Sequence, residues 1–141
     1  MIPLHILIAD DEAILCDLLE TILRNFGHET VTAQNGDEAV GHLLHDDFDL
    51  VITDLEMGET NGLEVVRRAK EIDETTIVFL MTGCRDSQCR TQALLSGADA
   101  FLAKPFAIDE LISLIQFHSI KYLAAGKWGL PVPQKALMVS E

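Results

Sequence analysis

The stretch from Leu50 to Asp54, LVITD, limits the fold more than any other part of this chain. It is a short apolar run without polar alternation, and it meets a carboxylate at its last position. Such a run indicates a central strand buried on both faces, as in a parallel sheet. Asp54 then stands at the carboxyl end of that strand, where open α/β sheets place their ligand crevice. Taken alone, Asp54 is better explained as a residue that ends the strand and turns the chain, or that caps the next segment.

Strand-like and helix-like segments alternate along the chain. The predicted strands cover residues 4–9, 29–33, 48–53, 76–81 and 100–103. The predicted helices cover about residues 12–26, 36–45, 63–72, 87–96 and 108–123. We expect the second strand, which is rich in Thr and Val, at or near an edge of the sheet. Five strands alternating with five helices imply right-handed crossovers and a parallel sheet covered on both faces.

Apolar residues recur at three- and four-residue steps in the helical segments, which places them on one face. On the first three helices the residues expected to point inward are Ile14, Leu15, Leu18, Leu19, Ile22, Leu23 and Phe26, then Ala39, Val40, Leu43 and Leu44, then Leu63, Val66, Ala69 and Ile72. Asn35 and Glu38 have the spacing of a capping box at the start of the second helix. Gly27 and Gly97 are the expected stops of the first and fourth helices.

The composition is that of an ordinary soluble globular protein, with 48% hydrophobic and 23% charged residues among 141. This length predicts one domain whose core needs neither disulfides nor metal ions for stability. We expect the domain to occupy residues 1–124 and residues 125–141 to form a tail or linker stub. Lys and Arg number 10 against 23 Asp and Glu, so the formal charge is −13. An acidic chain repels phosphate backbones, which argues against direct nucleic-acid binding.

The three cysteines, Cys16, Cys84 and Cys89, form a sparse and odd-numbered set. Cys16 lies within an apolar helical pattern, which indicates a small core residue. Cys84 and Cys89 have no second Cys or His pair at the spacing of a zinc site, so we expect no metal cluster there. A reducing compartment is the simplest interpretation. Because we recognise no signal peptide and no apolar run long enough to span a bilayer, we expect a cytoplasmic protein without a membrane partner.

Polar side chains follow four of the five predicted strands. They are Asp10 and Asp11 after the first strand, Asp54 after the third, Thr82 after the fourth and Lys104 after the fifth. The carboxyl ends of parallel strands share one edge of the sheet, so these side chains should converge. Clustered carboxylates repel one another unless a cation lies among them, and Mg²⁺, a hard ion with oxygen ligands, is the best match. A hydroxyl and an ammonium suit phosphoryl oxygens, which makes Asp54 a candidate nucleophile toward a phosphoryl group.

This set resembles the receiver domain of two-component response regulators. The resemblance rests on Asp10-Asp11, Asp54, Met57, Gly62, Thr82 and Lys104-Pro105-Phe106, and it covers about residues 2 to 123. It implies a flavodoxin-like, doubly wound α/β fold with five parallel strands in the order 2-1-3-4-5 and five helices. It also implies a phosphorylation-controlled switch that is no metabolic enzyme. Its only catalysis would be Mg²⁺-dependent phosphoryl transfer to its own aspartate and autodephosphorylation.

The resemblance assigns the metal and the phosphoryl group to particular residues. Asp54 would accept the phosphoryl group from a sensor histidine kinase or a histidine phosphotransfer protein. Asp11 and Asp54 would give carboxylate oxygens to Mg²⁺. Asp10 would act largely through metal-bound water, and Glu56 would give its backbone carbonyl.

The resemblance also assigns the switch. Lys104 would pair with Asp54 before the transfer and with the phosphoryl group afterwards, and Thr82 would move toward the phosphate. Phe101 would occupy the aromatic switch position, although an aromatic residue on a short strand is more often plain core. The switched surface would engage a downstream effector protein or an output domain.

Two other functions fit parts of the pattern. Phosphohydrolases that resemble the haloacid dehalogenase superfamily use a strand-end aspartate nucleophile, but they place a second aspartate two residues on, where this chain has Glu56. A receiver-like interaction module that is not phosphorylated is the other alternative, and the complete acidic, Thr and Lys set argues against it. Gly58, where family members usually have proline, and Gly83, where many have alanine, enlarge the freedom of the loops beside the site.

Two further expectations concern residues at the margin of this set. Glu56 and Cys84 lie two residues beyond Asp54 and Thr82, so their side chains should affect the lifetime of the phosphorylated state. The carboxylate of Glu56 would either orient or repel the attacking water. The tail is either a flexible terminus or a segment that docks on the receiver or on a second copy in a homodimer.

Overall fold

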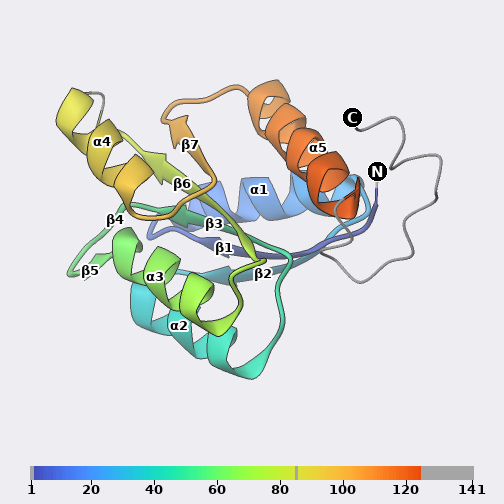
Figure 1. Cartoon of the computed structure of the whole chain (residues 1–141), viewed down its shortest axis with the longest axis horizontal. Helices are drawn as coiled ribbons and strands as arrows, with labels where there is room; N and C mark the ends of the chain where they lie inside the picture. The colour runs from blue at the N-terminus through green and yellow to red at the C-terminus, as the bar shows by residue number, and fades with distance from the viewer. Residues whose placement is uncertain (1, 85, 125–141) are drawn as a thin grey trace. The chain divides into compact units, whose positions relative to one another are not determined.

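The computed structural model describes residues 2–84 and 86–124. Its main sheet has five parallel strands in the order β2-β1-β3-β6-β7 (Figure 1). These strands are β1 (His5–Ala9), β2 (Glu29–Ala33), β3 (Leu50–Asp54), β6 (Ile77–Thr82) and β7 (Ala100–Ala103). Since β6 and β7 are the fourth and fifth strands of this sheet along the chain, the predicted order 2-1-3-4-5 is confirmed. The predicted edge position of β2 is confirmed as well.

The three central strands, β1, β3 and β6, carry apolar side chains on both faces of the sheet, and these strands are therefore buried. Every residue of β3 and β6 is buried, and β1 is buried except at His5. β3 pairs in parallel with β1 and with β6, which places Asp54 beside Met81. The continuous apolar runs therefore predicted burial on both faces correctly, and the strands end along one edge of the sheet.

Helices cover both faces of this sheet. α1 (Ala13–Asn25) lies on one face, while α2 (Gly36–His45) and α3 (Gly62–Ile72) lie side by side on the other (Figure 1). The predicted cap of α2 is confirmed, because the side chain of Asn35 accepts a hydrogen bond from the backbone N–H of Glu38 at 2.7 Å.

The core on the α2 and α3 face joins strands to helices. Leu7, Val51 and Val78 stand on neighbouring strands and belong to one buried cluster with Leu43 of α2 and Val66 of α3. Alternation along each strand sends the intervening residues to the opposite face. A slip of one residue would exchange the two buried sets, so burial of both faces sets the register. The register in turn sets where each strand ends and which side chains stand there.

Several side chains predicted to point inward are exposed. Among the described residues of α1, Cys16, Leu19 and Leu23 are fully buried. The exposed residues of the predicted inward set are Ile14 and Leu18 on α1, Phe26 directly after α1, Leu44 on α2 and Ile72 on α3. The prediction was wrong at these positions because three- and four-residue steps spread an apolar set over a wider arc than the sheet covers.

A short antiparallel hairpin follows β3, where a plain loop was expected. Its strands are β4 (Glu56–Met57) and β5 (Thr60–Asn61), and Gly58 between them has a φ of 62°. Strands of two residues leave no periodic signal in the sequence. Proline cannot adopt this φ, so the observed turn requires a residue such as glycine at position 58.

Two helices complete the described chain. α4 (Ser87–Leu95) begins with a cap by Asp86, whose side chain accepts from the backbone N–H of Cys89 at 2.8 Å, and it is followed by Gly97 with a φ of 96°, as predicted for a helix stop. α5 (Ile108–Ala124) belongs to a separate compact unit that begins at Phe106. None of the described helices is both long and apolar enough to cross a membrane. The tail, 125–141, and both interpretations of it lie outside the described residues.

Candidate functional site

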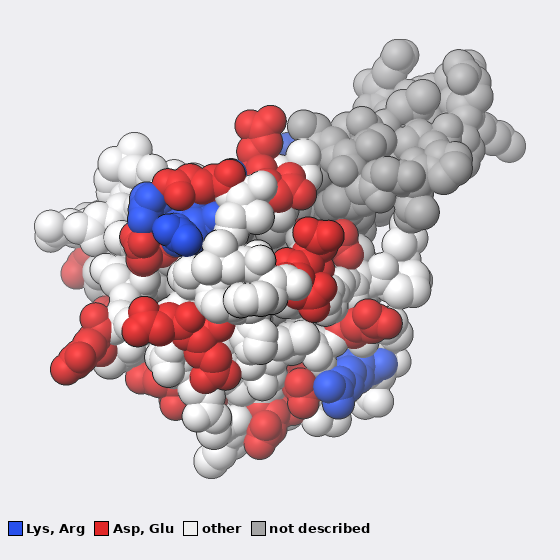
Figure 2. Space-filling model, turned by 90° about the horizontal axis from the view of Figure 1, so that it is seen from below, with Lys and Arg blue, Asp and Glu red and all other residues white. Residues whose placement is uncertain are grey.

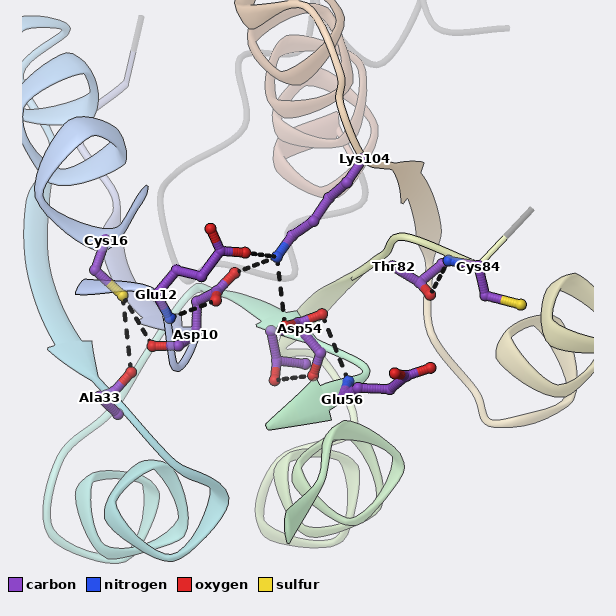
Figure 3. A network of polar contacts seen from close by, with 10 residues as sticks. Asp10, Glu12, Cys16, Ala33, Asp54, Glu56, Thr82, Cys84 and Lys104 are labelled. Carbon is purple, nitrogen blue, oxygen red and sulfur yellow. Dashed lines mark hydrogen bonds and ion pairs between the residues drawn. The ribbon is translucent and has the colours of Figure 1, made fainter. Parts of the chain in front are cut away.

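Acidic side chains meet at the carboxyl edge of the sheet. Asp10 follows β1 and is fully buried, and Asp54 ends β3 with a side chain only 9% exposed (Figure 3). Asp11 is exposed. One carboxylate oxygen from each of the three residues lies within 4.8 Å of the others. The structure thus brings together the three carboxylates that the strand ends predicted.

The backbone at Asp54 is closely approached by the start of α3. A Cβ added to Gly62 would lie 2.0 Å from the carbonyl oxygen of Asp54. The Gly62 N–H donates to the carbonyl of Leu55 at 2.7 Å, and the Leu55 N–H donates to the carbonyl of Met81 at 2.7 Å. Any larger residue at position 62 would displace the backbone that carries Asp54, which gives this motif glycine a physical reason.

Lys104, directly after β7, extends its ammonium to the buried acids (Figure 3). Its Nζ lies 2.7 Å from Asp10 Oδ2 and 3.4 Å from both Asp54 Oδ2 and Glu12 Oε1. The expected pairing with Asp54 is present, but Asp10 is the closer partner. Burial alone lowers the pKa of Lys104, but the hydrogen bond to Asp10 and the charge of Asp54 outweigh it and raise the pKa to about 12. The lysine is therefore charged at neutral pH.

Neighbouring positive charge only partly offsets the negative charge of the buried Asp54 carboxylate. Burial raises the pKa of Asp54 most, the charge of Asp10 raises it as well, and Lys104 opposes both effects, so that the resulting pKa is about 6. A cation among the carboxylates would relieve this imbalance. The three converging donors are oxygens, which are the ligands that Mg²⁺ prefers in proteins. The residues present therefore fit a magnesium site.

Thr82 ends β6 and is buried. Its hydroxyl oxygen accepts a hydrogen bond from the backbone N–H of Cys84 at 3.0 Å (Figure 3). Its backbone carbonyl accepts from the N–H of Lys104 at 2.7 Å, which joins the ends of β6 and β7. The peptide bond between Lys104 and Pro105 is cis. The predicted hydroxyl thus stands at the right strand end, with its observed hydrogen bond directed to the following loop.

Glu56 and Phe101 are the two other residues that the resemblance assigns to the site. The backbone N–H of Glu56 donates to Asp54 Oδ1 at 3.5 Å, and its side chain is exposed. Phe101 stands in β7 beside Leu80 and packs, partly buried, against the core cluster. This packing is that of a core residue, and the roles of Phe101 as a switch and of Glu56 in the phosphorylated state stay predictions.

The structure corrects the expectation for two of the cysteines. Cys84 and Cys89 are joined by a disulfide, whereas a reducing compartment predicts thiols. Their sulfurs lie near a carboxylate oxygen of Asp86, but disulfide sulfurs do not offer the thiolates that bind metal ions. Cys16 is buried, as predicted, and its thiol donates to the backbone carbonyl of Asp10 at 3.3 Å. The pairing was missed because two cysteines in a loop and a helix turn carry no signature in one sequence.

Most charged residues of this chain are acidic. On the face in Figure 2, Asp and Glu side chains are widely spread, while Lys and Arg occupy small groups. This distribution agrees with the formal charge of −13, and it is unfavourable for a nucleic-acid backbone.

The fold and the site together define a doubly wound α/β protein with an acidic site at the strand ends. A comparison with protein-family models matches residues 6–116 to the response regulator receiver domain. The chain belongs to this family, and it is a receiver domain of two-component signal transduction. The assignment decides against the phosphohydrolase alternative.

Curated relatives are transcriptional regulatory proteins. TrcR of Mycobacterium tuberculosis is 31% identical over 114 residues, which cover 81% of this chain and 44% of TrcR. ResD of Bacillus subtilis is 36% identical over 107 residues, which cover 76% of this chain and 44% of ResD. The chain therefore spans less than half the length of these relatives.

Solved structures share the fold. The response regulator TrrA of Thermotoga maritima, in complex with Mg(2+)-BeF, is 33% identical with a TM-score of 0.73, and the match covers 81% of this chain and 97% of that one. A CheY-like receiver domain protein from Methanospirillum hungatei is 25% identical with a TM-score of 0.77, over 82% of this chain and 93% of that one. Both likenesses support the doubly wound assignment.

Proposed function

We propose that Asp54 accepts a phosphoryl group and that its phosphorylation switches the partner-binding surface of this receiver. The observation that carries the proposal is the position of Asp54. It is a nearly buried strand-end carboxylate, its oxygens lie with those of Asp10 and Asp11, and the ammonium of Lys104 is 3.4 Å away. An aspartate so placed has the geometry of a carboxylate nucleophile with positive charge beside the incoming phosphoryl oxygens.

Asp10, Asp11 and Asp54 would hold Mg²⁺ through carboxylate oxygens, Asp10 largely through water, and Glu56 through its backbone carbonyl. The ion, when bound, supplies positive charge that offsets the phosphoryl oxygens and the clustered carboxylates. The structure of TrrA with Mg(2+)-BeF supports this assignment by likeness.

Lys104 and Thr82 would bind the phosphoryl group from the other side. Lys104 stays protonated, holds Asp54 before the transfer and then neutralises a phosphoryl oxygen. Thr82 would exchange its hydrogen bond with the Cys84 amide for one that its hydroxyl donates to the phosphate. Movement of Thr82 would change the packing at β7, where Phe101 serves as the aromatic switch, and so bias a two-state surface.

The proposal extends to the partners and the setting. A sensor histidine kinase or a histidine phosphotransfer protein would donate the phosphoryl group, and a downstream effector protein or an output domain would read the switched surface. We assign the receiver to residues 1–124 and a tail or linker stub to 125–141, with a homodimer as a further state of the chain. The protein would work in the cytoplasm without direct contact with nucleic acid or membrane, and it would catalyse only its own phosphorylation and dephosphorylation.

Incubation with acetyl phosphate tests this function without the cognate kinase. Intact mass should show the gain of one phosphoryl group in the presence of Mg²⁺ and no gain with excess EDTA. No gain under either condition would favour the alternative of a receiver-like module that is not phosphorylated.

A further inference from the structure

Two cysteines lie directly beyond the phosphoryl-acceptor site. Cys84 stands in the loop after β6, and Cys89 stands in the first turn of α4. A disulfide joins them across five positions, with Cα atoms 6.2 Å apart. Both residues are only half-buried, so solvent and small thiols have access to them.

Structural stabilisation is a weak explanation for this bond. A disulfide that closes so short a loop removes little entropy from the unfolded chain. The domain also has a continuous buried core drawn from its strands and helices, the feature that small disulfide-dependent domains lack. A bond that the fold does not need is free to be made and broken.

The third cysteine does not compete for oxidants. Cys16 is only 2% exposed, and its thiol donates to the backbone carbonyl of Asp10 at 3.3 Å. Thiol exchange needs a sulfur atom that dissolved disulfides can reach, and the buried Cys16 does not offer one. Exchange chemistry is thus confined to the pair of Cys84 and Cys89.

The disulfide is connected to the site through Thr82. The backbone N–H of Cys84 donates to the hydroxyl oxygen of Thr82 at 3.0 Å, and the backbone N–H of Cys89 donates to Asp86 Oδ1 at 2.8 Å. The bond therefore ties the amide that holds the Thr82 hydroxyl to the capped first turn of α4. With the bond formed, Cys84 cannot move away from Thr82 without moving that turn.

We propose that Cys84 and Cys89 are a reversible redox modification site whose disulfide holds Thr82 in the arrangement of the unphosphorylated receiver. Oxidation would then oppose phosphorylation of Asp54, and reduction would permit it. This inference rests on the proposed function of Asp54. It also reconciles a disulfide with a reducing compartment, where such bonds are usually transient and redox-sensing.

The chemistry needs a low-molecular-weight disulfide of the glutathione type as oxidant. The thiolate of one cysteine attacks that disulfide, forms a mixed disulfide and releases one small thiolate. The thiolate of the other cysteine attacks the protein sulfur of the mixed disulfide, forms the bond between Cys84 and Cys89 and releases the second small thiolate. Two electrons pass from the cysteines to the small disulfide, and their two protons end on the released thiols. Two molecules of a small thiol reverse the reaction.

The test compares samples of the chain, residues 1–141, that are equilibrated with oxidised or reduced glutathione. Peptide mapping without reductant should show the Cys84–Cys89 link only in the oxidised sample. With acetyl phosphate and Mg²⁺, the oxidised sample should reach a phosphorylated fraction about 5-fold lower than the reduced one, the factor that one hydrogen bond is worth. The variant with both Cys84→Ser and Cys89→Ser should label alike in both buffers, whereas Cys16→Ser should keep the difference. Thr82→Ala should remove the difference, because it removes the connection.

The outcomes of this labelling experiment distinguish failure of the redox inference from failure of the proposed function. Equal labelling of oxidised and reduced protein overturns the redox inference and leaves the function of Asp54 intact. A labelling difference that persists in the double serine variant shows that Cys84 and Cys89 are not the redox site. A labelling difference that persists in Thr82→Ala shows that the disulfide does not act through Thr82. The absence of labelling in both the oxidised and the reduced sample overturns the proposed function, and the redox inference with it.

Discussion

Lys104 Nζ lies 2.7 Å from Asp10 Oδ2, an ion pair between the ends of β7 and β1 across 94 positions of sequence. The Asp10 side chain is fully buried and that of Lys104 is 17% exposed. A buried pair of this kind is weak evidence for stability by itself, but removal of one partner leaves the other charge uncompensated. The lysine thus holds the acidic site together until another cation takes part.

Replacement of Lys104 by Met should therefore destabilise the protein by about 3 kcal/mol without divalent ions. Mg²⁺ should reduce this loss, because the ion would compensate the same carboxylates. Urea unfolding with and without Mg²⁺ measures both values. Lys70→Met is the matched control, since Lys70 pairs with Asp99 at 2.8 Å with side chains 22% and 19% exposed. The stability that Lys70→Met loses should be the same with and without Mg²⁺. If Mg²⁺ changed the stability loss of both variants equally, the account would be contradicted.

The raised pKa of Asp54 predicts a pH-dependent stability. A folded-state pKa of about 6 against 3.8 means that the folded protein binds this proton more tightly than the unfolded chain. The group favours folding below pH 3.8, and this contribution is lost as the pH rises through 6. Metal-free Asp54→Asn should therefore be more stable than wild type at pH 7.5, by at most about 3 kcal/mol. The difference should vanish near pH 4. Thermal unfolding across this range checks it, and a wild type that is the more stable at pH 7.5 would refute the assignment.

Most of the fold was accessible from the sequence because burial on both faces leaves a continuous apolar run. The run that ends at Asp54 identified a central parallel strand, and the strand ends located Asp10, Thr82 and Lys104 at one edge. Periodicity was less informative on the helices, where Ile14 shares the steps of buried residues and is nevertheless exposed. A step pattern identifies a helix, but the extent of its buried arc depends on what packs against it.

The details of the site depend on distances that no spacing encodes. Asp10 is nearer to Lys104 than Asp54 is, but the two distances from Lys104 Nζ differ by less than 1 Å. The hairpin at Gly58 is too short for a pattern, and the Cys84–Cys89 bond depends on the exact course of a loop into α4. These features arise from tertiary placement, which local sequence rules do not describe.

Mg²⁺ binding should depend on Asp11. This residue is exposed, and its carboxylate lies with those of Asp10 and Asp54. Asp11→Ala should weaken Mg²⁺ binding by at least about 10-fold, because one of few protein ligands is lost. Calorimetric titration provides the measurement, and Asp37→Ala, an exposed acid in the first turn of α2, is the control. Wild-type affinity in Asp11→Ala would count against the site.

Gly62 should be intolerant of a side chain. A Cβ there would lie 2.0 Å from the Asp54 carbonyl oxygen, so the backbone must shift. Gly62→Ala should lose about 3 kcal/mol of stability and label poorly with acetyl phosphate. Gly41→Ala in α2 meets nothing within 4 Å and should gain up to about 1 kcal/mol. Urea unfolding of the two variants separates a steric effect from a general effect of replacing glycine. Equal changes in stability for Gly62→Ala and Gly41→Ala would contradict the steric explanation.

Intact mass of wild type and Asp54→Asn after acetyl phosphate treatment in Mg²⁺ tests the central claim most directly. Asn keeps the shape of the side chain and removes the nucleophilic oxygen charge, while Asp10 and Asp11 remain as competing carboxylates in the same site. The account predicts one added phosphoryl group on the wild type and none on Asp54→Asn. Undiminished labelling of Asp54→Asn would show that another residue accepts the group.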